Sequence, residues 1–236
     1  MDDEAGLEEF RACKRGWRLT SGCVVDTLLG GGVESGTITQ FYGPAGVGKT
    51  NLCLVYSVGA VRQGKRVVFI DTEGGHSFDR VRQIAGDAYE RVVEMTQFYE
   101  ARTFEEQDFI VQNVEQVLDE GFGLIVLDSA VNLYRLDRSE DRVGEMNRRL
   151  SRQMAKLMEL ARRYCLAVII TNQVYSSEHR LEPVAGDVLR YWSKAIVELR
   201  KLNRVREAVL RRHRSLPEGL RVRFVIEERG IAGVEG

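Results

Sequence analysis

The chain is poor in the side chains that build disulfide scaffolds and zinc sites. Its 236 residues include four cysteines and three histidines, and no two cysteines form a C-x-x-C pair. This scatter excludes a disulfide framework and a zinc site of the usual spacing. We expect the cysteines to be small, buried side chains of a protein in the reducing cytoplasm; they are Cys13, Cys23, Cys53 and Cys165.

Long apolar runs are missing as well. No segment approaches the ~20 consecutive apolar residues of a membrane-spanning helix, and the acidic start Met1-Asp2-Asp3-Glu4 is unlike a signal peptide. Hydrophobic residues make up 44% of the chain and charged residues 29%, as in a soluble globular protein. The length fits one α/β domain. We therefore expect a cytoplasmic protein with no membrane partner.

The net charge of −1 hides an uneven distribution. Residues 1–10 contain five acidic side chains and no basic one, whereas residues 190–224 contain eleven Lys or Arg and three Asp or Glu. Such a basic segment could face nucleic acid or phosphate. It could equally be a solvated edge of a highly charged protein, and the pattern by itself leaves both readings open.

Apolar segments typical of buried strands alternate with segments of helical spacing. This alternation predicts a mostly parallel, twisted sheet covered by helices on both faces. The expected strands are 36–42, 66–71, 92–95, 124–128 and 166–171, and the expected helices are 24–29, 51–61, 77–86, 104–120 and 145–164.

The pattern also predicts which side of one helix is apolar and how the last strands are arranged. In the helix at 104–120, the apolar face is predicted to consist of Phe109, Ile110, Val114, Val117 and Leu118. Near the end of the chain, the segments 195–199, 208–212 and 221–226 follow one another with no helix between them. We expect these three to be antiparallel strands added at one edge of the sheet.

Residues 43–50 match the phosphate-binding pattern G-x-x-x-x-G-K-[ST]. A strand precedes the loop and an apolar helix follows it, which is the setting this loop requires. Its glycines let backbone N–H groups form a concave anion site, and the helix directs its positive end at the phosphates. Lys49 would contact the β- and γ-phosphates and Thr50 would bind Mg²⁺. The sequence predicts ATP and Mg²⁺ as ligands, with the nucleotide held by Gly43, Pro44, Ala45, Gly46, Val47, Gly48, Lys49, Thr50 and Asn51.

Three polar side chains stand where apolar strands end. Asp128 is placed to hold Mg²⁺ at the carboxyl edge of a parallel sheet, although it could merely cap a strand. Glu73 could orient and deprotonate the water that attacks the γ-phosphate, or it could be a surface turn residue. Gln173 could hydrogen-bond the γ-phosphate, or it could be an ordinary loop glutamine.

In chain order, these motifs resemble the core of the RecA/Rad51/RadA recombinases, from about Arg18 to the end of the chain. The final segment is similar to the archaeal RadB group, the short paralogues of RadA. The resemblance is carried by Thr20-Ser21-Gly22 with Asp26, residues 28–32, the loop at 43–50, residues 71–74, 124–129 and 171–174, and, for RadB, residues 212–220 with Phe224 and 228–231.

The resemblance implies a RecA-like P-loop ATPase core, with a short lead-in at 1–16 and a single domain at 17–236. It implies that Lys49 and Thr50 are the P-loop lysine and Mg²⁺ ligand. Asp128 would be the Walker B aspartate, Glu73 the catalytic base, and Gln173 the residue that senses the γ-phosphate. By the same resemblance, Arg80 stacks on adenine, a role that suits a planar guanidinium.

The chain departs from the recombinases at several points. It has no space for the N-terminal helix–hairpin–helix domain of RadA. Phe10-Arg11-Ala12-Cys13 has the wrong spacing for the Phe-x-x-Ala polymerisation motif, which argues against self-assembly into filaments. His76 and Phe78 stand where the family usually has Phe and Pro, so the turn there is expected to differ.

The two DNA-binding loops of the family correspond to residues 133–144 and 175–186. Their candidate DNA contacts are Arg135, Arg138, Arg142 and Arg180, which would grip phosphates without reading sequence. Tyr134 or Tyr175 could stack on bases or serve packing. Arg212 and Arg214 could reach a nucleotide across a subunit interface, contact DNA, or lie at a solvated strand end.

The sequence therefore predicts a weak, DNA-dependent ATPase that assists homologous recombination and repair. As the resemblance implies, its partners would be single- and double-stranded DNA, a RadA-type recombinase and the Holliday-junction resolvase. One alternative is an ATP-binding mediator that does not hydrolyse ATP. Another is a single-domain KaiC-like regulatory ATPase, against which the absence of paired glutamates in Thr72-Glu73-Gly74 counts.

Overall fold

The computed structural model describes residue 13 and residues 16–75, 77–137, 140–177 and 180–234. The strands are β1 Arg18–Leu19, β2 Val33–Glu34, β3 Ile38–Gly43, β4 Arg66–Asp71, β5 Thr96–Glu100, β6 Phe122–Asp128, β7 Ala167–Ser177, β8 Arg180–Pro183, β9 Ala195–Leu202, β10 Val205–Arg212, β11 Arg221–Glu227 and β12 Gly230–Gly233. The α-helices are α2 Val25–Leu28, α3 Lys49–Arg62, α4 Phe78–Ala85, α5 Tyr89–Met95, α6 Phe104–Asn113, α7 Asn132–Asp137, α8 Val143–Arg163 and α9 Gly186–Trp192.

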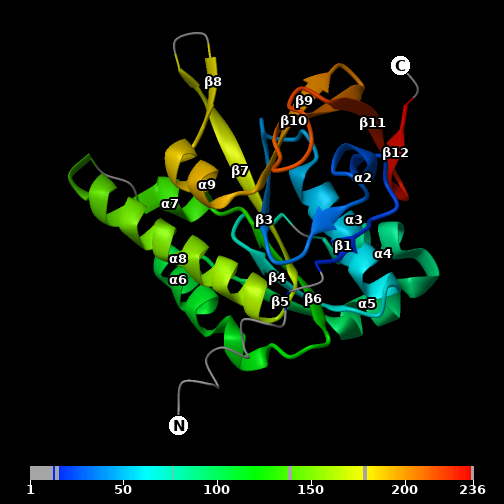
Figure 1. The fold of residues 1–236 in the computed structure, drawn as a ribbon, viewed down its shortest axis with the longest axis horizontal. Coiled ribbons are helices and arrows are strands. Elements are labelled where there is room, and N and C mark those ends of the chain that lie inside the picture. The colour runs from blue at the N-terminus through cyan, green and yellow to red at the C-terminus, as the bar shows by residue number, and fades with distance from the viewer. Residues whose placement is uncertain (1–12, 14–15, 76, 138–139, 178–179, 235–236) are drawn as a thin grey trace.

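One large sheet organises the chain, with strand order β12-β11-β10-β9-β3-β7-β6-β4-β5. The strands from β9 to β5 are parallel, whereas β10, β11 and β12 are antiparallel. Strand β8 pairs with the far end of β7 as a hairpin that projects from the body (Figure 1). The predicted RecA-like arrangement, a mostly parallel sheet with antiparallel strands at its C-terminal edge, is confirmed.

Helices cover both faces of the sheet (Figure 1). On one face α2, α3, α4 and α5 pack over a core that includes Phe41, Phe69 and Val126. On the other face α6, α7, α8 and α9 pack over a second core that includes Ile38, Ile70 and Ile125. Neighbouring strand residues thus point to opposite cores, as the pleat requires, and this explains why the central strands are apolar throughout.

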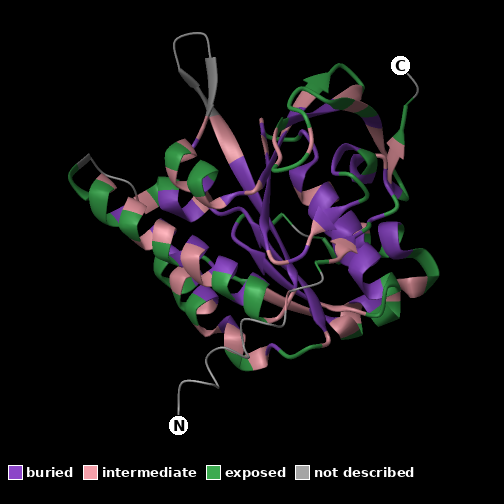
Figure 2. Cartoon of the chain, in the orientation of Figure 1, coloured by how far each residue is buried: buried purple, intermediate pink, exposed green. Residues whose placement is uncertain are grey.

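The two long helices meet the sheet differently (Figure 2). Helix α3 follows the phosphate-binding pattern and is buried on nearly all sides, because the antiparallel strands of the C-terminal edge fold over it and contact it through β12. Helix α8 is amphipathic and buries one stripe that includes Met146, Leu150, Met154 and Leu157. The helix that carries Lys49 and Thr50 is therefore set rigidly in the core.

Two predicted elements near the middle of the chain need correction. Residues 92–95 are not a strand but the end of helix α5, because Tyr89, Val92 and Met95 recur at helical spacing and pack on the core beside α3. The strand begins only at Thr96.

The helix predicted at 104–120 is shorter than expected. Helix α6 ends at Asn113, and a 3₁₀ turn, Val114–Val117, follows it. Its buried positions include Phe104, Gln107 and Val111, which leaves Phe109 on the opposite side and 69% exposed. The apolar face was therefore assigned wrongly at Phe109, although Val114 and Leu118 are buried as expected.

Two strands also differ from expectation. Residues 195–199 belong to β9, which is antiparallel to β10 but parallel to the central strand β3. Strand β7 extends to Ser177, so Gln173 lies within a strand instead of a loop. The register pairs Gln173 with Gly43, the first residue of the phosphate-binding pattern. Across the described part of the chain, no helix is both long and apolar enough to cross a bilayer.

Candidate nucleotide-binding site

The pattern at 43–50 forms the turn between the central strand β3 and the buried helix α3, as predicted. Gly48 occupies the N-cap position, with φ of 111°, and no side chain caps the helix there. The first N–H groups of α3 are therefore open to a ligand, and the helix dipole favours an anion at this point.

Two glycines of the loop are required by space as well as by conformation. A Cβ atom on Gly48 would stand 2.7 Å from Cδ1 of Ile226 in β11, and one on Gly43 would stand 2.4 Å from the backbone oxygen of Leu199 in β9. The φ of Gly48 also lies in the left-handed region that favours glycine. Strands β9 and β11 thus leave no room for a side chain at Gly43 and Gly48.

Lys49 lies across the loop. Its Nζ donates to the backbone oxygens of Gly43 at 3.0 Å and Pro44 at 3.1 Å, and the residue is 7% exposed. Burial lowers the pKa of the Lys49 ammonium, while the charges of Glu73 and Asp128 act in the opposite direction. The lysine and the two carboxylates are thus close enough to interact, as a phosphate site with a metal ion requires.

Asp128 ends β6 and is 1% exposed. Burial raises the pKa of its carboxyl from the ordinary 3.8 to about 6, although hydrogen bonds from Thr171 and Thr50 favour the ionised form. Thr171 Oγ1 donates to Asp128 Oδ1 at 2.5 Å. A buried carboxylate beside the Thr50 hydroxyl is a donor set that fits Mg²⁺, and a cation there would offset the cost of burying the charge.

Glu73 stands on a tight turn after β4, where Asp71 fixes the backbone. Asp71 Oδ1 accepts from the N–H groups of Glu73 at 2.9 Å and Gly74 at 3.0 Å. Gln173 reaches this turn from β7, and its Nε2 donates to Glu73 Oε1 at 2.7 Å. The structure thus brings together the predicted base and the predicted γ-phosphate sensor, which lie 100 residues apart in the chain.

Arg80 is held close to the phosphate-binding helix. Its Nε donates to Asn51 Oδ1 at 2.7 Å, and its terminal nitrogens donate to the backbone oxygens of Glu227 at 2.7 Å and Glu228 at 2.9 Å. The guanidinium plane is therefore fixed between α3 and the turn that joins β11 to β12. This position is compatible with the predicted adenine contact, which stays a prediction.

The predicted DNA contacts that the structure describes lie on three different elements. Arg135 lies on helix α7 and Arg142 in a 3₁₀ turn before α8. Arg180 begins strand β8, so the second predicted DNA loop is largely a β-hairpin. Arg138 lies outside the described residues.

Tyr134 has a packing role. It is buried against Phe104 in an edge-to-face contact, and its hydroxyl donates to Asn147 Oδ1 at 2.8 Å. The sequence allowed Tyr134 either to stack on bases or to pack in the core, and in this conformation its burial excludes base stacking.

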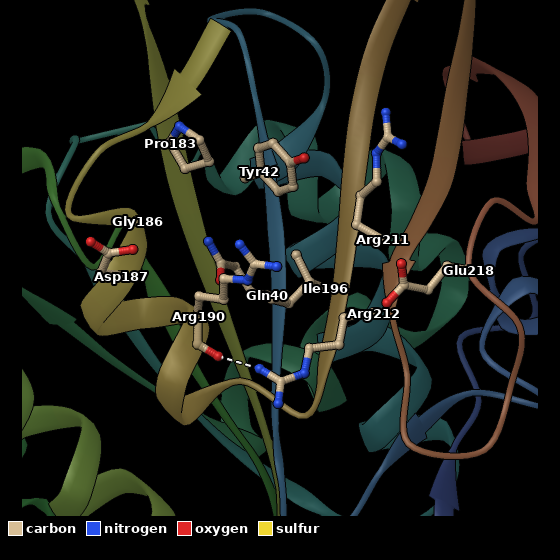
Figure 3. Close-up of a pocket in the computed structure, with 10 residues that line it drawn as sticks. All are labelled: Gln40, Tyr42, Pro183, Gly186, Asp187, Arg190, Ile196, Arg211, Arg212 and Glu218. Carbon is tan, nitrogen blue, oxygen red and sulfur yellow. Dashed lines mark hydrogen bonds between the residues drawn. The ribbon is translucent and has the colours of Figure 1, made fainter.

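A hollow of about 860 Å³ lies on the side of β3 opposite α3, between α9, β9 and β10 (Figure 3). Phe41 stacks on Tyr56 of α3, so Gln40 and Tyr42 face the hollow. Arg212 lines it and donates to the backbone oxygen of Arg190 at 2.6 Å. The hollow is therefore a polar surface on the opposite face of the sheet from the phosphate-binding helix.

The basic segment near the end of the chain is partly neutralised. Arg211 pairs with Glu198 in β9, and Arg214 pairs with Glu34 in β2. Both arginines are thus tied to their own chain by ion pairs.

Comparison with known proteins places this geometry in a family. Residues 14–234 match the family model described as Rad51. The chain belongs to the Rad51 family. The match spans the described β1–β12 and all eight described α-helices, so the phosphate-binding turn and the residues around it lie in a Rad51-type core.

Individual relatives agree with this placement. The chain is 45% identical over 235 residues to the DNA repair and recombination protein RadB of Methanothermobacter thermautotrophicus, covering 95% of this chain and all of that protein. It is 46% identical over 206 residues to the protein of the same name from Methanocaldococcus jannaschii, covering 86% and 96%. A solved structure described as the RadB recombinase superposes with a TM-score of 0.80 at 37% identity, covering 92% of this chain and all of that one. The resemblance to RadB is confirmed.

Several residues of this Rad51-type site could not be chosen from the sequence. Thr171 touches Asp128, and Asp71 holds the Glu73 turn. Asn132, on α7, donates from Nδ2 to the backbone oxygen of Thr72 at 2.8 Å. Thr171 and Asp71 did lie inside the motifs quoted for the resemblance, but Asn132 carried no signal, because its role depends on how α7 packs.

Proposed function

We propose that the chain is an ATP-binding, weakly ATP-hydrolysing, DNA-binding accessory protein of homologous recombination and DNA repair. The observation that carries the proposal is the convergence of Lys49, Thr50, Asp128, Glu73 and Gln173 at the carboxyl edge of the sheet. The repair and recombination role is supported by the printed names of its relatives.

The phosphates of ATP bind along the N-terminus of α3, where open N–H groups and Lys49 Nζ donate to their oxygens. The oxygens of Thr50 and Asp128 would hold Mg²⁺, and the ion would supply positive charge that offsets the charge of the phosphates. The planar guanidinium of Arg80 lies against adenine.

Glu73 acts as the base. It accepts a proton from a water molecule whose oxygen forms a bond to the γ-phosphorus. The bond between that phosphorus and the β–γ bridging oxygen breaks, and ADP leaves with the bridging oxygen. Gln173 donates to a γ-phosphate oxygen and so reports whether the γ-phosphate is present.

DNA binds through phosphate contacts from the loop arginines, without reading sequence. The contacts proposed are Arg135, Arg138, Arg142 and Arg180. The protein works in the cytoplasm, modulates a RadA-type recombinase and contacts a Holliday-junction resolvase.

The test is ATP turnover of wild type and of Glu73→Gln, with and without single-stranded DNA, over a range of protein concentrations. Glu94→Gln on α5 is the matched control, because Glu94 is exposed and outside the site. Loss of the base is expected to lower turnover by about 10²- to 10⁴-fold. Equal rates for wild type and Glu73→Gln would overturn the assignment of Glu73.

The other interpretations are outcomes of the same experiment. Tight ATP binding with no turnover would identify a mediator in which the nucleotide acts only as a switch. A complete lack of binding to single-stranded and duplex DNA at low salt in a filter assay would favour a KaiC-like regulatory ATPase.

A further inference from the structure

Arg135, one of the proposed DNA contacts, also reaches Gln173 at the edge of the candidate nucleotide site. Its Nη1 donates to Gln173 Oε1 at 2.5 Å, and Gln173 Nε2 donates to Glu73 Oε1 at 2.7 Å. These two hydrogen bonds form a chain from helix α7 through strand β7 to the turn after β4. Arg142, by contrast, pairs with Glu145 in the first turn of the following helix α8.

The hydrogen-bonding chemistry of Arg135 and Glu73 fixes the orientation of the Gln173 amide between them. A guanidinium only donates hydrogen bonds, and an ionised carboxylate only accepts them. The Gln173 amide satisfies both neighbours in one orientation, with its oxygen toward Arg135 and its NH₂ group toward Glu73. If Arg135 is removed, the amide oxygen of Gln173 loses the donor that anchors it, and the single hydrogen bond to Glu73 is left to hold the side chain.

The backbone around this chain of contacts is well fixed. Gln173 pairs in register with Gly43 at the start of the phosphate-binding loop. Asn132, one turn before Arg135 on α7, donates to the backbone oxygen of Thr72, directly before Glu73. Thr72 and Ser129 are joined by two hydrogen bonds, each of 2.9 Å. The freedom that remains is therefore that of the side chains.

We propose that Arg135 is a positioning residue of the ATPase site, which holds the Gln173 amide so that its NH₂ group faces both Glu73 and the γ-phosphate. Arg135 touches neither the substrate nor the reacting atoms and acts through Gln173. The proposal rests on the proposed ATPase function and adds to it a residue that was assigned only to DNA.

The first test measures steady-state ATP hydrolysis without DNA for Arg135→Ala, Gln173→Ala and the double variant. Arg148→Ala is the matched control, an exposed arginine on α8. We expect Arg135→Ala to lower kcat by about 10- to 100-fold with little change in KM, because a small misplacement near the reacting atoms is costly. The double variant should equal Gln173→Ala, and Arg148→Ala should equal wild type. Additive losses in the double variant, or an unchanged kcat in Arg135→Ala with unchanged thermal stability, would overturn the proposal.

The second test needs no nucleotide. In a ¹⁵N–¹H spectrum, the side-chain NH₂ signals of Gln173 are identified by their loss in Gln173→Ala. We expect them to shift toward those of free glutamine in Arg135→Ala and to stay in place in Arg148→Ala. Signals already at free-glutamine positions in wild type would overturn the proposal. A shift in Arg135→Ala combined with no ATP turnover in wild type would support the contact chain and overturn the proposed ATPase function instead.

Discussion

Replacing Asp128 by Asn is predicted to stabilise the protein in the absence of nucleotide while removing one ligand of the proposed Mg²⁺ site. The carboxyl of Asp128 has its pKa raised to about 6 by burial. Between pH 3.8 and about 6, the folded protein therefore holds a proton that the unfolded chain has lost. The unfolding free energy consequently falls as the pH rises through this interval. Asparagine carries no such charge and can still accept from Thr171 through its oxygen.

The size of the effect follows from the shift. A rise of about 2 pKa units corresponds to about 3 kcal/mol at neutral pH, since each unit corresponds to about 1.36 kcal/mol. Asp128→Asn should therefore be more stable than wild type by up to about 3 kcal/mol at pH 7.5, with a Tm higher by about 2–4 °C for each kcal/mol. The difference should shrink toward zero near pH 4.

The assay is urea unfolding of wild type and Asp128→Asn from pH 4 to pH 7.5, without nucleotide. Asp87→Asn serves as the control, because Asp87 is exposed in the turn before α5 and should show no such difference. Adding Mg²⁺ and ADP should stabilise wild type by mass action but have little added effect on Asp128→Asn. A variant that is less stable than wild type at pH 7.5, or one whose stability difference does not change with pH, would refute the reasoning.

Three further predictions use other parts of the structure. Gly48→Ala should lower the unfolding free energy by about 1–3 kcal/mol and weaken nucleotide binding, because residue 48 needs a positive φ and the new methyl group would meet Ile226. Adding Ile226→Val removes the contacting Cδ1 atom, so the double variant should regain part of the lost unfolding free energy in urea unfolding but not all of it. Phe104→Ala should lower the unfolding free energy by about 3–5 kcal/mol, whereas Phe109→Ser should change it by no more than about 0.5 kcal/mol. A larger loss for Phe109→Ser than for Phe104→Ala would contradict the orientation of α6. Arg142→Ala should lower the slope of log affinity against log salt for single-stranded DNA by about 0.7, as loss of one phosphate contact would, and an unchanged slope would remove Arg142 from the DNA contacts.

The elements that the sequence predicted correctly are those with a strong local pattern. Strand β4 was predicted with its observed bounds, and α3 and α8 to within two residues. The errors occurred where two patterns compete locally. The pair Val92-Val93 suits a strand and a helix equally, and only packing beside α3 makes it helical. The tail of the 104–120 helix likewise tightens into a 3₁₀ turn for reasons that local spacing does not contain.

In the candidate site, too, features with a local sequence pattern were predicted and contacts between distant elements were not. The residues from Gly43 to Thr50 were identified from the sequence because the phosphate-binding loop is a continuous segment whose chemistry and spacing are local. Asp128, Glu73 and Gln173 were proposed because each stands at or just after the end of an apolar run in the sequence, and parallel strands end at a common edge. The partners of Asp128 and Gln173 were not identified, since Thr171 and Arg135 reach them through contacts between elements that are distant in the chain.

By itself, the sequence determined that this chain has a RecA-like core with a phosphate-binding loop, and it determined which carboxylates and amide stand near that loop. The tertiary structure decided how those groups are connected. It buried Asp128 deeply enough to raise the pKa of its carboxyl, placed β11 against Gly48, and brought Arg135 within hydrogen-bonding distance of Gln173. The physical reason is that composition and periodicity fix which face of an element is buried, whereas hydrogen bonds between side chains depend on the distances at which separate elements pack.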